Sequence, residues 1–196
     1  MIPRHFQITI ALLLLAVLIS GIVIIRLTRK EEAMSAQASE GGLTAPVPGG
    51  KQEQIQVLVA YDDEQALRWR PADAFLPADR GPRAREVLRA VLAQYVQTPS
   101  PHPMAKGTDI RDVYLLGDDT MIIDMTAQFA DGHPSGILLE ELTLASLIET
   151  LAANVPGVAK VKFLVDGKER ETLAGHADLM SFYQTTAVHE LAKEFE

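Results

Sequence analysis

An uninterrupted apolar stretch near the N-terminus, Ile8 to Ile25, is the feature that most constrains how this chain can be organised. It contains no ionisable side chain, and charged residues flank it, with Arg4 before it and Arg26 after it. In a helix that rises about 1.5 Å per residue, the stretch spans about 27 Å, close to the hydrocarbon thickness of a bilayer. We therefore predict one membrane-spanning helix, with residues 1–30 forming this anchor and its flanks.

Two other interpretations of this stretch stay open, a cleaved signal peptide and a buried core helix. The nearest match to a signal-peptidase site, Ala36-Gln37-Ala38, lies beyond a charged cluster and far from the apolar core, which favours retention of the anchor. The chain has no cysteine, so a lipid anchor attached to cysteine is excluded.

Membrane orientation does not follow from the charges alone. Three basic residues follow the apolar stretch and one precedes it, which by itself would keep the C-terminal part in the cytoplasm. Long C-terminal domains, however, cross the membrane largely regardless of such charges.

Residues 31–54 are rich in Ala, Ser, Gly, Pro and Gln and contain few large apolar side chains. Such a segment cannot bury enough surface to offset the entropy of ordering it, so we predict a flexible linker with a root-mean-square span of about 25–30 Å. We expect a folded domain at 55–180 and a C-terminal tail with a short helix at 181–196.

The part after the linker is acidic. From Lys51 to the end, 23 acidic residues stand against 14 basic ones, a net charge of −9. Nucleic acids and anionic lipid headgroups require a basic footprint, so neither is an expected partner. Without cysteine, structural disulfides and thiolate zinc sites are also excluded.

Hydrophobic periodicity and turn residues predict the elements of the domain. We expect strands at 55–61, 110–116, 120–125 and 160–165. A helix is expected from Pro82 to Gln97, and a second, mostly buried one from an N-cap at Ser135 to Asn154. The order β-α-β-β-α-β predicts an α+β fold, the split arrangement with two helices on one face of a sheet of about four strands.

Two surface features allow alternatives. The segment Leu67 to Asp79 contains two prolines and is predicted to be an extended loop, with Trp69 either packed onto the domain or exposed as an anchor for a partner. Arg83, Arg85 and Arg89 are expected on the outer face of the first helix, where they are solvated or bind phosphate or carboxylate groups.

Candidate catalytic and metal-binding residues are sparse. His102, His133 and His176 have no metal-binding spacing, so a metal site would have to be assembled from separate loops. Asp124 is either one of two carboxylates of a hydrolase, paired with Glu140, Glu141 or Asp178, or a strand residue that bonds nearby backbone.

The sequence contains no nucleophile elbow, P-loop or dinucleotide fingerprint. The acidic pairs Asp62-Asp63 and Asp118-Asp119 lack the alternating oxygen spacing of a calcium loop and are interpreted as solvated turns. We expect no cofactor and no metal.

A series of short motifs resembles the GerMN domain of sporulation and spore-germination proteins. They are, in order, Tyr61 at a strand end, Gly107-Thr108, Ile123-Asp124-Met125-Thr126 with Phe129, the Gly136 helix with Glu149-Thr150-Leu151, Pro156-Gly157-Val158, Asp166-Gly167 and Leu173-Ala174-Gly175-His176. The resemblance spans Ile55 to Leu179. The region Leu92 to Pro99 departs from the family pattern because it lacks a glycine.

The resemblance implies a non-catalytic, extracytoplasmic module held at the inner membrane by a single-pass signal-anchor. Its expected partners are envelope proteins or peptidoglycan, and it is expected to form a homo-oligomer in one variant of this hypothesis. The alternative is a peptidoglycan-acting envelope hydrolase that uses Asp124 and a loop histidine.

Overall fold

The computed structural model describes residues 50–196. The predicted anchor, Ile8 to Ile25, and most of the predicted linker lie outside the described residues. Within 50–196, no helix combines the length and the apolar content needed to cross a bilayer. The described residues belong to one compact unit, which includes the predicted C-terminal tail.

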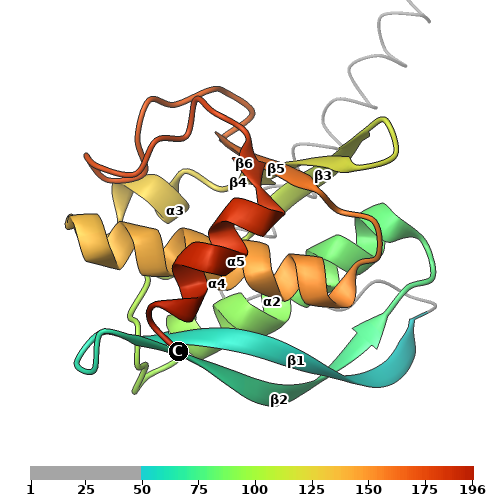
Figure 1. The fold of residues 1–196 in the computed structure, drawn as a ribbon, viewed down its shortest axis with the longest axis horizontal. Helices are drawn as coiled ribbons and strands as arrows, with labels where there is room; N and C mark the ends of the chain where they lie inside the picture. Colours follow the sequence, from blue (N-terminus) through green and yellow to red (C-terminus); the bar gives the residue numbers. More distant parts are fainter. Residues whose placement is uncertain (1–49) are drawn as a thin grey trace, which may run out of the picture. The chain divides into compact units, whose positions relative to one another are not determined.

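The described residues form an α+β fold with two separate sheets and four helices (Figure 1). A long antiparallel hairpin, β1–β2, makes one sheet, and strands β3, β4, β5 and β6 make the other in that order. The elements are β1 Lys51–Tyr61, β2 Ala66–Leu76, α2 Arg80–Val96, β3 Ile110–Leu116, β4 Thr120–Met125, α3 Gln128–Asp131, α4 Ile137–Asn154, β5 Lys160–Val165, β6 Tyr183–Gln184 and α5 Thr185–Lys193.

The larger sheet agrees with the predicted strands. Strands β3 and β4 form an antiparallel hairpin, and β5 joins β4 in parallel, each with the bounds expected from the sequence. The turn between β3 and β4 begins at Gly117, whose φ of +65° is a conformation that side chains with a Cβ disfavour.

Helix α4 lies in the interior, between the hairpin β1–β2 and the larger sheet (Figure 1). Every residue from Leu142 to Leu151 is buried. A central helix segment that is buried on every side is typical of a layer between two sheets. Its small polar residues bond internally; for example, Thr150 accepts the backbone N–H of Leu58 at 2.8 Å.

The predicted single sheet with two helices on one face is wrong, because β1 pairs with β2 and with no other strand of residues 50–196. Polar side chains of the helices take the place of a strand along the other edge of β1. Thr150 and Tyr95 accept the N–H groups of Leu58 and Ala60, and Asn154 donates to the carbonyl of Gln56, each at 2.8 Å. Since these backbone groups already have partners, β1 does not join the larger sheet.

The predicted loop from Leu67 to Asp79 is also wrong, because most of it is β2. Pro71 lies within this strand opposite Gln56, whose carbonyl points away from β2 and toward Asn154. Pro71 therefore stands at a position where no N–H is needed for the pairing, and the strand tolerates it as an edge strand does.

Several element ends differ from the predictions. Strand β1 begins at Lys51, four residues earlier than expected. The N-cap of α4 is Gly136 instead of Ser135, and the carboxylate of Glu140 accepts the Gly136 N–H at 3.2 Å. Helix α5 begins at Thr185, and it packs against α4 as part of the same unit.

Candidate binding site

Within the described part of the chain, Asp124 does not meet a loop histidine, as the hydrolase alternative would require. Asp124 is buried in β4, where its Oδ1 accepts the N–H of Gly167 at 2.7 Å and its Oδ2 lies 3.7 Å from Nε of Arg111. This is the geometry of a strand residue that holds a neighbouring turn. Within residues 50–196, the contacts of Asp124 are with Gly167 and Arg111, and none joins it to a histidine.

His176 instead meets Glu140, whose side chain is fully buried at the start of α4. The two oxygens of Glu140 accept the N–H groups of Ala174, His176 and Ala177 at 2.9–3.0 Å, together with Nδ1 of His176 at 2.9 Å. Burial opposes ionisation, but the His176 bond and the three backbone N–H bonds outweigh it and lower the pKa of Glu140 to about 2. Glu140 thus fastens the loop 173–177 to α4.

The other two predicted histidines converge on one hydroxyl. Nε2 of His102 lies 2.6 Å from Oγ1 of Thr143, and Nε2 of His133 lies 2.7 Å from the same atom. His102 also bonds through Nδ1 to the carboxylate of Asp62, in the turn after β1. These four residues come from separate parts of the chain, and we call them the histidine cluster.

The hydrogen bonds of the histidine cluster need more protons than its neutral form holds. The Thr143 hydroxyl also lies 2.8 Å from the carbonyl of Leu139, and Nδ1 of His133 lies 2.7 Å from the carbonyl of Pro134. Five contacts therefore need a proton each. An ionised aspartate, two neutral imidazoles and one hydroxyl carry only three.

Burial lowers the pKa of His133 below its ordinary value of 6.5, so its neutral form is favoured at pH 7. Because the Pro134 carbonyl can only accept, the proton of neutral His133 lies on Nδ1. Its Nε2 is then an acceptor, and the single proton of the Thr143 hydroxyl can be donated either to this nitrogen or to the carbonyl of Leu139. The cluster therefore holds three segments of the chain together through one buried hydroxyl.

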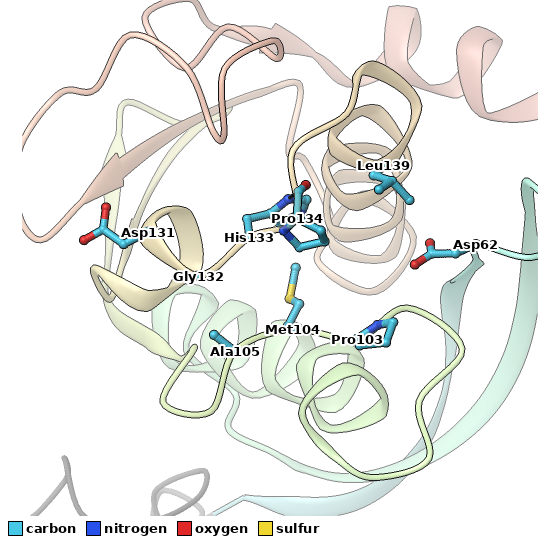
Figure 2. A pocket seen from close by; sticks show the side chains of 9 residues that line it. All are labelled: Asp62, Pro103, Met104, Ala105, Asp131, Gly132, His133, Pro134 and Leu139. Carbon is cyan, nitrogen blue, oxygen red and sulfur yellow. Dashed lines mark hydrogen bonds between the residues drawn. The ribbon is translucent and has the colours of Figure 1, made fainter.

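An open hollow of about 520 Å³ lies beside this cluster (Figure 2). Its lining consists of Asp62, Pro103, Met104, Ala105, Asp131, Gly132, His133, Pro134 and Leu139. Asp62 and Asp131 stand at opposite ends of it, so they do not form a carboxylate pair. Thr143 has no exposed surface and does not line the hollow, so its hydroxyl is unavailable to a substrate.

The described residues contain no candidate metal site. Within residues 50–196, no group of three or more His, Cys, Asp or Glu side chains is arranged to hold an ion. In the two acidic turns, Asp62 binds His102, and Asp119 accepts a hydrogen bond from the hydroxyl of Thr120 at 2.8 Å.

The arginines of α2 are neither fully solvated nor free to bind an anion. Arg83 forms two bonds to Glu53 at 2.7–3.1 Å, and Arg89 forms two bonds to Asp109 at 2.8–3.0 Å. Arg85 forms one bond, at 2.6 Å, to the carboxylate of Asp112 in β3. These pairs tie α2 to both sheets, so the prediction of a solvated face is wrong in this respect.

Two polar residues of α4, Thr143 and Glu149, were not singled out as site residues from the sequence. Both are buried. The sequence does contain a signal for both residues, because a polar side chain within an otherwise apolar helix must find a hydrogen-bond partner. That signal identifies neither the partner nor the segment that supplies it.

The comparisons with known proteins agree with the motif series. Residues 57–171, more than half of the chain, match the sequence profile of the family described as "Germane: Sporulation and spore germination". No curated protein matches the chain.

Two solved structures resemble it. A candidate lipoprotein from Clostridium perfringens shares 19% identity over 73% of this chain and 93% of its own, with a TM-score of 0.47. The tandem GerMN domains of the sporulation protein GerM from Bacillus subtilis share 16% identity over 67% of this chain, with a TM-score of 0.45. This chain covers 45% of that tandem protein.

Proposed function

Because this chain belongs to the Germane family of sporulation and spore germination proteins, we propose that it is a membrane-anchored, non-catalytic binding module of the cell envelope. The apolar segment Ile8 to Ile25 anchors it in the inner membrane with a single pass. The domain faces outward and binds another envelope protein or peptidoglycan. This orientation rests on the family and on the ability of long C-terminal domains to be translocated.

The observation that carries this proposal is a row of aromatic and aliphatic side chains around Lys162, on the face of the larger sheet opposite the core residues Ile123 and Phe163. Tyr114 of β3 is 48% exposed and pairs with Ile122, which pairs with Lys162. The ammonium of Lys162 lies 5.4 Å from the centroid of the Phe182 ring, which is 44% exposed. We call these four residues, together with Leu116, the sheet-face row.

The face of the sheet is a better docking surface than its β3 edge. Arg85 of α2 donates to the carbonyl of Arg111 at 3.1 Å, and Arg80 donates to the carbonyl of Asp118 at 2.7 Å. These bonds occupy backbone groups along the outer side of the β3–β4 hairpin. An added strand would have to displace them, whereas the exposed rings of the sheet-face row are available as they stand.

In-cell crosslinking of the full-length protein tests this proposal. We expect crosslinks to specific envelope proteins or retention on purified sacculi, and we expect the double variant Tyr114→Ser, Leu116→Ser to lose most of that signal. Ile137→Ser is the matched control, because Ile137 is 62% exposed at the start of α4, away from this face. Full binding by the double variant, or no binding by the wild type, contradicts the proposal.

A further inference from the structure

A second hollow, of about 340 Å³, is lined by residues of β2, α4 and α5. It is lined by Trp69, Glu149, Ala152, Ala153, Thr185, Thr186 and His189, and we call it the Trp69 groove. The groove is present because α4 has only two small side chains, Ala152 and Ala153, where it passes between the Trp69 ring and the start of α5. Its volume is at the small end of the range for ligand pockets, about 300–1,000 Å³.

Glu149 supplies an incompletely paired charge to this groove. Its side chain is only 6% exposed, and its Oε2 lies 2.8 Å from Nδ1 of His189. The other oxygen, Oε1, has no hydrogen-bond donor within residues 50–196. This oxygen reaches solvent in the groove, where a bound donor can take the place of water.

Trp69 supplies the other half of the site. Its indole is 36% exposed, and Nε1 donates to a carboxylate oxygen of Glu196 at 3.2 Å, which orients the ring. Among side chains, the indole ring attracts a cation most strongly when the cation lies within about 6 Å of the ring centroid. An aromatic ring and an open carboxylate in one groove are thus complementary to a positive charge.

The surrounding charges favour the same class of ligand. No Lys or Arg lines the groove, and the part of the chain from Lys51 onward has a net charge of −9. A field of this sign raises the local concentration of cations. A sugar ring would also stack on Trp69, but it would leave the charge of Glu149 without a counterion.

We propose that the Trp69 groove binds a lysine or arginine side chain of a partner protein. The side chain would lie over Ala152 and Ala153, place its cation near the indole and donate to Oε1 of Glu149. This inference rests on the proposed binding function, but it uses a different surface from the sheet-face row.

Intrinsic fluorescence provides the test, because Trp69 is the only tryptophan of the chain. Full-length protein in detergent is titrated with a capped Gly-Lys-Gly peptide and a capped Gly-Arg-Gly peptide. The neutral isosteres carry norleucine and citrulline in place of lysine and arginine. We expect a saturable change with the charged peptides, at least tenfold weaker binding of the isosteres, and weakening by added salt.

Variants separate the groove from general charge attraction. Glu149→Gln should weaken binding about tenfold, while Glu190→Gln, an exposed change of equal charge on α5, should not weaken it. Ala153→Leu fills the groove from its exposed side and should abolish binding even if Glu149→Gln impairs folding, which circular dichroism will reveal.

Equal binding of charged and neutral peptides, no saturable change, or a response to N-acetylglucosamine oligomers instead of the basic peptides overturns this inference. If it is overturned while in-cell crosslinks through the sheet-face row persist, the proposed function stands. If those crosslinks are absent as well, both fall.

Discussion

Nδ1 of His176 lies 2.9 Å from Oε1 of Glu140, a carboxylate with no exposed surface that comes 36 residues earlier in the chain. The same carboxylate accepts three backbone N–H groups of the loop 173–177. Glu140 therefore supplies the loop with hydrogen-bond acceptors that a neighbouring strand would otherwise provide.

Replacing Glu140 should release the loop. Glu140→Gln keeps the shape of the side chain but removes the charge and places an NH2 group opposite backbone donors, so we expect a loss of about 2–3 kcal/mol in the free energy of unfolding. Chemical denaturation measures this loss, and hydrogen exchange should show faster exchange at Ala174 and Ala177. Unchanged protection of both amides would contradict the assignment.

Acid should destabilise the domain through the same residue. The pKa of Glu140 is about 2 in the folded state, against 4.5 as its ordinary value, so the unfolded chain binds the proton first. The stabilisation is present above pH 4.5 and is lost as the pH falls toward 2, at most about 3 kcal/mol. Unfolding free energies measured across this range should fall for the wild type and change less for Glu140→Gln.

The histidine cluster should respond to pH in a higher window. The pKa of His133 is lowered by burial, so its neutral form stabilises the fold at neutral pH, and this contribution declines as the pH falls below 6.5. Thr143→Val removes the hydroxyl that bonds both rings and should cost about 1–3 kcal/mol. An NMR titration of the His133 ring should give a pKa below 6.5 in the wild type. A value above 6.5 would refute the neutral assignment.

Asp124 should matter for a turn and not for catalysis. Asn at this position can still accept the Gly167 N–H, so Asp124→Asn should cost less than about 1.5 kcal/mol. Zymography on peptidoglycan should show no clearing by either protein. Clearing by the wild type that disappears in the folded variant would establish the hydrolase instead.

Pro71 should be replaceable. Its position in β2 requires no N–H, so Pro71→Ala should change stability by less than about 1 kcal/mol. Ala72→Pro is the matched comparison. Ala72 pairs with Ile55 at the alternate position, where the N–H points into the hairpin, and a proline there should cost about 3 kcal/mol. Equal effects of the two changes would contradict the strand register.

Local sequence patterns predicted the elements whose partners lie close in the chain. The hairpin of β3 and β4 depends on a glycine turn, and β5 depends on alternation of apolar and polar residues, so the local sequence is enough to delimit both. The apolar character of α4 likewise predicted a buried helix. The motif series predicted the family, which the match over residues 57–171 confirms.

Contacts between distant segments decided the rest. The pairing of β1 with β2 depends on Thr150, Tyr95 and Asn154, which reach the edge of β1 from the two helices. The meeting of His102 and His133 at Thr143, and of Glu149 with His189, depends on where the loops and α5 settle against α4. A sequence shows which polar residues must be satisfied when buried, but only the packed chain determines which groups satisfy them, because those partners are neighbours in space and not in sequence.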